Sequence, residues 1–436
     1  MAEEEADLEA GQRHRYRRSL LGHPDGRDFR QLWAGDTVSQ LGTQIGVIAL
    51  PLLAVTVLQA DEFQMGMLVA FETIAFLLVG LPAGAWVDRM RKRSVLIAGD
   101  LVRGIALLTL PAAYLLDLLS FPLLLVVAAV VGVATVFFDV AYQSYLPSLV
   151  PSSRISEGNA KLQVSQSGAQ VIGPAVGGFL IRLMGAPLVI LIDAVSFFGS
   201  ALFLLRIRHR EEPASRQNRR PLFTEIGEGL SFVVRQPLLR RVVATTSIGN
   251  LFNTVGQAML VLFAIRDLGI GEAGLGIALS IGAVSGLIGA FTSEAIIRLI
   301  GAGRTIAYSM LPTVVTSALV PLAAGRSEAT AIAMLSISMV FFGFAVVVYN
   351  VAQVSFRQRL CPRPLLGRMN ASVRFIVWGS MPIGALLGGV IGGAYGAVTA
   401  LWVSFAGMTL SVLPVLLSPL RRMRDLPRAL DQHLDA

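Results

Sequence analysis

The chain has 436 residues, of which 54% are hydrophobic and 15% are charged, and its formal net charge is +8. A soluble protein carries about 25% charged residues, so this composition excludes a soluble globular domain. The basic residues lie mainly in short loops between apolar runs, where they set topology, so we exclude a nucleic-acid-binding role. Cys361, the single cysteine, excludes an intrachain disulfide and a cysteine-rich metal site.

Twelve apolar runs follow one another along the chain, with the length of about 20 residues that a helix needs to cross a bilayer. Because lipid offers backbone groups no hydrogen-bond partners, these runs are predicted to be helices. The first thirty residues lack the apolar core of a signal peptide, so the first run is predicted to be retained. The predicted spans are 30–58, 65–87, 94–116, 122–147, 161–184, 187–206, 241–263, 274–298, 305–325, 327–351, 370–394 and 397–417.

The connections between the spans alternate in charge, and most arginines lie on one side, as in "DRMRKR", "RLIGAGR" and "RQRLCPRPLLGR". By the positive-inside rule this side is cytosolic. We expect a multi-pass protein of the cell (inner or plasma) membrane with both termini in the cytosol. The apolar spacing of "LFTEIGEGLSFVVRQ" favours an amphipathic helix on the membrane face. The predicted units are a cytosolic tail (1–28), a six-helix bundle (29–206), a cytosolic linker (207–240), a second six-helix bundle (241–418) and a cytosolic tail (419–436).

The two halves of the chain contain a repeat. The segment "FDVAYQSYLPSLVPSSRISEGNA" (138–160) aligns without a gap with "YNVAQVSFRQRLCPRPLLGRMNA" (349–371). In the same register, five glycines of the first half align with five glycines of the second half. The composition of the chain means that some of these matches are expected by chance. The repeat predicts two pseudo-symmetric bundles in the same orientation, an arrangement typical of transporters whose substrate site lies between two halves.

A charged turn joins the second and third predicted spans. Topology alone explains its cations, but not Asp88 beside them or Gly84 one helical turn earlier. Gly84, Asp88, Arg89 and Arg93 resemble the loop motif G-x-x-x-D-R-x-x-x-[RK] of the major facilitator superfamily, with Arg91 in place of a usual glycine. The altered motif, "GDLVRG" and "PSLVP" together look most like the branch of macrolide and enterobactin exporters.

That resemblance implies a twelve-helix fold and a cytosolic latch. In the latch the acid faces the start of the eleventh span, and the cations join a charge network between the halves. A carboxylate near a helix N-terminus is stabilised by free N–H groups and the helix dipole.

A second motif lies in the fifth predicted span. Gly173, Pro174, Gly177 and Gly178 match the core G-P-x-x-G-G of the family's antiporter motif, although Ala169 stands where a glycine is expected. Proline invites a bend, and glycines allow close contact between helices. The motif favours export, and tight packing of a membrane helix is the alternative explanation.

Ionisable groups inside spans are costly unless they are paired or hydrated, so they are candidates for function. Asp100 and Arg103 are one helical turn apart and can pair. Together with Asp36 and Asp139 we interpret them as an inner gate, although Asp36 could instead reach the interface by snorkelling. Glu72 has no cation within a helical turn, which suits a proton carrier, and Asp193 is the reserve. The alternative for these two acids is a structural hydrogen bond.

Amide side chains give candidates for a substrate cavity between the halves. Three share one face of the seventh predicted span, and two lie in the first. Aromatic residues near the tenth and eleventh spans could join them, although lipid or core packing explains these singly. The candidates are Gln40, Gln44, Asn250, Asn253, Gln257 and Trp378.

No catalytic constellation is apparent, so we expect neither an enzyme nor a cofactor or metal. The main hypothesis is a proton-coupled exporter of amphipathic small molecules such as drugs, antibiotics or siderophores, which works by alternating access. Its partners would be the substrate, protons and the bilayer, with no nucleic acid, and we expect a monomer. An importer on the same fold and a non-transporting receptor or assembly partner are the alternatives.

Overall fold

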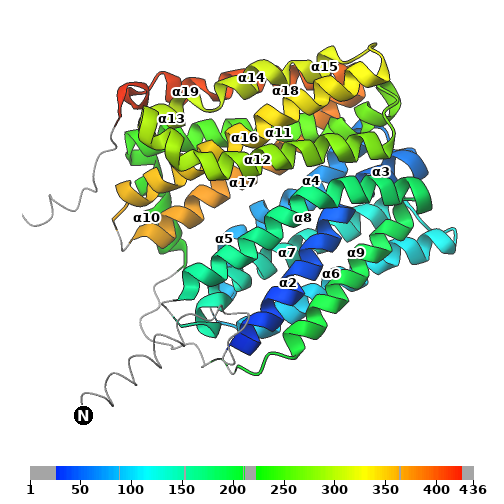
Figure 1. Cartoon of the computed structure of the whole chain (residues 1–436), viewed down its shortest axis with the longest axis horizontal. Coiled ribbons are helices and arrows are strands. Elements are labelled where there is room, and N and C mark those ends of the chain that lie inside the picture. The colour runs from blue at the N-terminus through cyan, green and yellow to red at the C-terminus, as the bar shows by residue number, and fades with distance from the viewer. Residues whose placement is uncertain are drawn as a thin grey trace, which may run out of the picture.

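The structure is a computed structural model that describes residues 26–87, 89–151, 154–209, 211, 222–362 and 365–424. Its regular elements within these ranges are helices (Figure 1). Within the described residues, ten helical segments are long and apolar enough to cross a membrane. The other two predicted spans correspond to α8 (Ile155–Met184) and to the pair α4 (Glu62–Leu78) and α5 (Gly80–Val87). The many polar side chains of α8 and the interruption between α4 and α5 set these two apart, and the all-helical membrane fold is as expected.

The first bundle contains the elements up to α9, drawn in blue to green in Figure 1. Besides α4, α5 and α8 it consists of α2 (Arg27–Gly46), α3 (Ala49–Leu52), the π-helical turn η2 (Leu53–Val57), α6 (Lys92–Leu115), α7 (Phe121–Leu149) and α9 (Ala186–Leu205).

The second bundle follows α10 (Leu222–Arg235), a short helix that packs on α17. Its elements are α11 (Pro237–Leu262), the π-helical turn η4 (Phe263–Asp267), α12 (Glu272–Ile300), α13 (Ala302–Tyr308), α14 (Leu311–Ser317), α15 (Leu319–Leu322), α16 (Glu328–Leu360), α17 (Leu366–Tyr395), α18 (Ala397–Ser411), α19 (Leu413–Leu416) and the 3-10 turn η6 (Pro419–Arg422).

The internal repeat of the sequence has a counterpart in the two bundles. The helices α8 and α17 both contain 30 residues and begin and end in the register of the sequence repeat. Each is followed by a glycine with positive φ, Gly185 at 84° and Gly396 at 85°, a backbone conformation that residues other than glycine rarely adopt. The first membrane-spanning segment of each bundle ends in a π-helical turn, η2 or η4. These matches support a duplicated six-helix unit.

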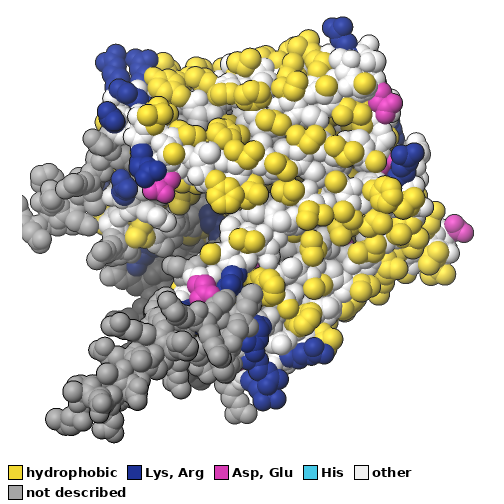
Figure 2. Space-filling view, viewed as in Figure 1, with side chains coloured by type: hydrophobic (Ala, Val, Ile, Leu, Met, Phe, Trp, Pro, Cys, Tyr) yellow, Lys and Arg dark blue, Asp and Glu magenta, His cyan; other side chains and the backbone are white. Residues whose placement is uncertain are grey.

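The two bundles meet at one end of the molecule and separate at the other. We call the end that carries α10 and the start of α2 the α10 end, and the end that carries η2 and η4 the far end (Figure 1). One cluster of buried apolar side chains, which includes Leu52, Met65, Met259 and Phe263, joins both bundles at the far end. Toward the α10 end each bundle has its own apolar cluster, and the surface between the bundles is hollowed (Figure 2).

Candidate functional site

A cavity of about 730 Å³ lies between the bundles. The turn after α2 and residues of α3, α4 and α8 line it from the first bundle, and residues of α11, α12, α14, α15, α16 and α18 line it from the second. Most of the lining is apolar, and the polar part consists almost wholly of hydroxyls and amides. Glu72 is the one ionisable residue among the lining residues. The cavity can therefore accept an amphipathic molecule, with a single carboxyl group in its wall.

Glu72 is positioned by the packing of α4 on α7. Gly132 of α7 lies so close that a Cβ atom there would be 2.5 Å from the backbone oxygen of Glu72. The Glu72 side chain is partly exposed to the cavity and has neither a hydrogen bond nor an ion pair within the described part of the chain. The sequence predicts a proton carrier at this residue, and a carboxyl group in the cavity wall without a fixed partner is compatible with that prediction, which stays a prediction.

Amides on both sides of the cavity supply neutral hydrogen-bonding groups. Asn253 and Gln257 line it from α11, where the sequence predicted them. Opposite them α8 contributes Gln163, Ser167 and Gln170, which were not predicted. Their spacing along "KLQVSQSGAQ" puts them on one helical face, and this polar stripe in an apolar chain was the available signal.

Three predicted cavity residues lie elsewhere. Gln40 is within hydrogen-bonding reach of Asp36, and the Cβ atom of Gln44 packs against Gly173. Trp378 makes an edge-to-face contact with Phe76 of the other bundle, with ring centroids 4.6 Å apart, and is not among the lining residues.

Asn250 lines a smaller cavity instead. This cavity of about 210 Å³ lies within the second bundle and shares Asn253 with the larger one. The Asn250 side-chain amide donates to the backbone oxygen of Val377 over 3.2 Å. This hydrogen bond connects α11 to α17, and Asn250 also borders the smaller cavity.

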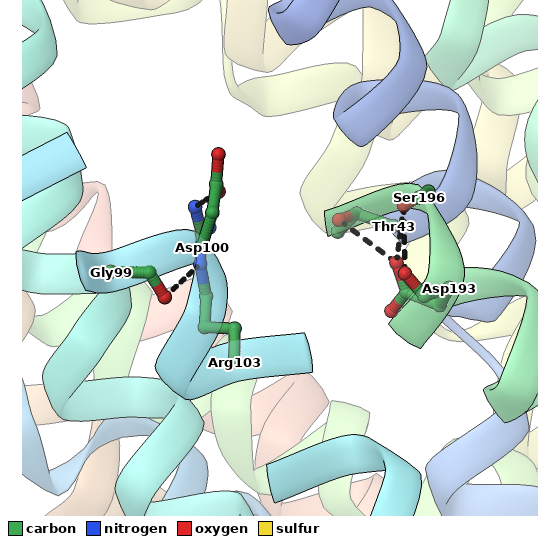
Figure 3. Close-up of polar contacts among 6 residues, drawn as sticks. All are labelled: Thr43, Gly99, Asp100, Arg103, Asp193 and Ser196. Atoms are coloured by element: carbon green, nitrogen blue, oxygen red, sulfur yellow. Dashed lines mark hydrogen bonds and ion pairs between the residues drawn. The ribbon is translucent and has the colours of Figure 1, made fainter. Parts of the chain in front are cut away.

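A buried charge cluster occupies the interior of the first bundle. Arg103 is 6% exposed and its guanidinium donates to Asp100 over 2.5 Å, so the predicted pair on α6 is present (Figure 3). The same guanidinium lies over the rings of Phe138 and Phe197, 4.1 and 4.3 Å from their centroids, which replaces water around the cation.

Three further acids lie near this cation. Asp139 and Asp193 interact electrostatically with Arg103, and so does the buried Asp36. The Asp193 carboxylate also accepts hydrogen bonds from Thr43 and Ser196, each over 3.4 Å (Figure 3). Asp193 therefore belongs to the Arg103 cluster and not to the cavity wall, which separates it from Glu72.

We expect Arg103→Met to destabilise the protein, because Asp100 would remain buried without its cation. Breaking a buried pair by removing one partner costs about 3–5 kcal/mol. Thermal unfolding of the purified protein in detergent would measure this as a lower Tm. The pair of Arg103→Met with Asp100→Asn should recover part of the loss.

The matched control is Arg298→Met. Arg298 pairs with Glu294 at 3.8 Å, but the two side chains are 73% and 82% exposed. Exposed pairs contribute about 0–1 kcal/mol, so this change should leave Tm nearly unaltered. An unchanged Tm in Arg103→Met would contradict a stabilising role for the buried cluster.

The charged turn after α5 is described without Asp88, which lies outside the described residues. Arg93 donates to the backbone oxygens of Leu204 and Leu205 at the end of α9, over 3.0 and 2.8 Å. These partners belong to the first bundle, whereas a network between the halves was expected. Arg89 is exposed, and a Cβ atom at Gly84 would meet nothing within 4 Å.

An acid that was not predicted caps the helix after this turn. The carboxylate of Glu211 accepts hydrogen bonds from the backbone N–H groups of Lys92 and Arg93, both over 2.6 Å. An anion is stabilised at a helix N-terminus by the free N–H groups and the dipole. In the sequence this acid appears within "HREEP", and no local pattern there indicates that Glu211 contacts the start of α6.

The antiporter-like motif lies where α8 touches its neighbours. Cβ atoms at Gly173 and Gly177 would lie 2.4 Å from Gln44 and 2.1 Å from the Ile45 oxygen, both on α2. A Cβ atom at Gly178 would lie 2.3 Å from the Glu272 oxygen on α12, in the other bundle. After Pro174, the N–H of Ala175 donates across the bundles to Ser280 over 3.0 Å.

The repeat produces a second such contact. Gly389 of α17 packs on Gly66 of α4, where a Cβ atom at Gly66 would lie 2.4 Å from the Gly389 Cα atom. We call these two crossings, α8 on α12 and α17 on α4, the far-end seam. Because backbone meets backbone there, the glycines hold the bundles together at this end.

A further ionisable residue between the bundles was missed in the sequence. The Arg374 guanidinium of α17 lies 4.4 Å from the ring centroid of Trp378 and interacts electrostatically with Asp139 of the first bundle. The spacing of four residues between Arg374 and Trp378 was a local signal, but the acid comes from a distant part of the chain.

Comparison with known proteins identifies the family. Residues 32–381 match the Major Facilitator Superfamily. The multidrug efflux pump Tap of Mycolicibacterium fortuitum is 24% identical over 364 residues, which is 80% of this chain and 86% of Tap. The uncharacterized MFS-type transporter YfiS of Bacillus subtilis (strain 168) is 26% identical over 234 residues, 53% of this chain, and the match spans only 55% of YfiS.

Solved structures agree with the fold. A bacterial homologue of the iron transporter ferroportin, 18% identical, superimposes in its inward-facing state with a TM-score of 0.73, covering 93% of this chain and 100% of that one. The outward-facing state of such a homologue superimposes with a TM-score of 0.59, covering 89% of this chain and 98% of that one. The chain belongs to the Major Facilitator Superfamily, a family of secondary transporters and not of enzymes.

Proposed function

We propose that this chain is a proton-coupled exporter of amphipathic small molecules. The observation that carries the proposal is the cavity between the bundles, whose largely apolar wall contains one ionisable group, the unpaired carboxyl of Glu72. Protonation of Glu72 and binding of a substrate in the same cavity would compete with each other or occur in alternation. Asp193 is the reserve proton carrier, and it would act through the Arg103 cluster.

Alternating access would use the two ends of the molecule in turn. The far-end seam and its apolar cluster keep the cavity closed at the far end. Rocking of the bundles would part the seam and close the α10 end, where Asp139 and Arg374 lie on opposite bundles as candidates for an inner gate. Asp36, Asp100 and the turn containing Asp88 would belong to the same gate.

The lining supports an amphipathic substrate. Apolar side chains such as Phe342 and Met408 would hold an apolar body, and Gln163, Gln170 and Gln257 would bind its polar groups. Tap, a relative over most of the chain, is a multidrug efflux pump. The antiporter-like motif also favours export, and the loop motif favours the branch of macrolide and enterobactin exporters.

Transport in proteoliposomes of known orientation tests this proposal against its alternatives. An exporter should accumulate a drug or siderophore against its gradient when the lumen is more acidic than the medium, with the α10 end facing outward. Accumulation only under the opposite gradient would identify an importer. If a panel of drugs and siderophores gives no gradient-driven movement, a non-transporting receptor becomes the better proposal.

We expect the α10 end, with the linker and both termini, to face the cytosol, because the arginines gather there. In a Cys361→Ala background, Gly227→Cys on α10 should resist a membrane-impermeant thiol reagent added to intact cells. Ser120→Cys, an exposed position at the far end, should react as the matched control. The reverse labelling pattern would overturn the orientation.

A further inference from the structure

A narrow groove lies on the second bundle and shares no lining residue with the cavity between the bundles. Its volume is about 230 Å³, and it is bounded by the last turns of α12, by α13 and by α16. Its walls are apolar side chains such as Ile296, Ile300 and Phe344. Phe341, also in the wall, is 41% exposed, so the groove opens onto the surroundings of the bundle. In a membrane-spanning bundle those surroundings are lipid.

Arginines lie on the elements that bound the groove, toward the α10 end. These arginines come from α12, α13, η6 and the residues directly after η6. Figure 2 shows a basic patch at the corner where α13 and α19 lie. A backbone contact holds the residues after η6 against α13, since Ala302 donates its N–H to the Arg424 oxygen over 3.1 Å. The exposed members are Arg298, Arg304, Arg421, Arg422 and Arg424. Glu294, paired with Arg298, is the acid beside them on α12, so the patch carries a clear positive excess.

We propose that this groove and its arginines bind one anionic phospholipid, with an acyl chain in the groove and the phosphate on the arginines. Apolar walls suit a hydrocarbon chain, and guanidinium groups match the oxygens of a phosphate. Basic pockets at the cytosolic edge of membrane helices bind anionic headgroups by the same chemistry.

A hydroxyl in the groove wall fits the same occupant. The side-chain oxygen of Ser309 is buried and has no hydrogen-bond partner within the described residues. A lipid in the groove would bring ester or phosphate oxygens that this hydroxyl can bind. The assignment does not depend on the substrate of the transporter or on the direction of transport.

Lipid binding to the delipidated full-length protein in detergent, followed by native mass spectrometry, tests the assignment. The wild type should bind phosphatidylglycerol more tightly than phosphatidylcholine of the same chain length. In the double variant Arg304→Gln, Arg421→Gln the affinity for phosphatidylglycerol should fall about tenfold or more, because two cations near the anionic headgroup are lost. Binding of phosphatidylcholine should stay the same.

Two controls make the result decisive. The double variant Arg206→Gln, Arg208→Gln removes two exposed arginines from the same end of the first bundle and should bind as the wild type does. Glycerol 1-phosphate, which has the headgroup chemistry without acyl chains, should fail to displace the lipid. Equal affinity in both double variants, or displacement by glycerol 1-phosphate, would overturn the proposal.

Discussion

Glu72→Gln is expected to abolish accumulation driven by a pH gradient while leaving substrate exchange intact. The amide keeps the size and hydrogen bonding of the carboxyl group but can neither release nor take up a proton. Since Glu72 is the one ionisable residue in the cavity wall, no neighbour there can replace it. Proteoliposomes with an imposed pH gradient would measure uphill transport, and counterflow of labelled substrate would measure exchange.

The controls separate the proton carrier from other acids. Glu294→Gln removes an exposed carboxyl on α12 outside the cavity and should transport as the wild type does. Asp193→Asn tests the reserve carrier. If Glu72→Gln accumulates substrate normally and Asp193→Asn does not, the proton is carried by the Arg103 cluster. Loss of exchange as well as accumulation would make Glu72 a substrate-binding group.

Gly178→Ala is expected to open the far-end seam. The added methyl group would lie 2.3 Å from the backbone oxygen of Glu272, and a backbone atom cannot turn aside as a side chain can. Overpacking of this kind costs about 1–3 kcal/mol. The balance between far-end-closed and far-end-open forms should therefore shift roughly fivefold or more. Transport should fall because the return to the closed form becomes the slow step.

Thiol labelling can follow this shift. Gln170→Cys, in a Cys361→Ala background, places a thiol in the cavity wall. A membrane-impermeant reagent added from the far end should label it faster when Gly178→Ala is present. Gly168→Ala on the same helix is the matched control, since its methyl group meets nothing within 4 Å. Equal labelling in the two variants would show that the seam does not depend on Gly178.

The fold was predictable because hydrophobic runs, arginine-rich loops and an internal repeat are local or periodic signals. The Asp100 and Arg103 pair was predictable for the same reason, since one helical turn joins them. Glu72 stood out because no cation lies within a turn of it. The sequence did not reveal that Asp193 shares the Arg103 cluster while Glu72 lies in the cavity, because this depends on how α9 and α4 pack.

The cavity wall was harder to predict than the fold. A helical period of 3.6 residues shows that Gln40 and Gln44 lie near one face of α2, but not which neighbour that face meets. These amides face residues of the first bundle, and the amides of α8 line the cavity instead. Contacts between distant segments, such as Glu211 at the start of α6 and Asp139 near Arg374, leave no pattern within either segment.

The single apolar cluster that joins the bundles at the far end gives this protein a thermal signature. A rearrangement that opens the far end must expose part of that cluster to water. If the closing α10 end buries less apolar area than this, the open form has the higher heat capacity. Apolar burial stabilises less strongly as the temperature falls. Cooling should therefore favour the far-end-open form, and the resting orientation of the transporter would depend on the temperature at which its host lives.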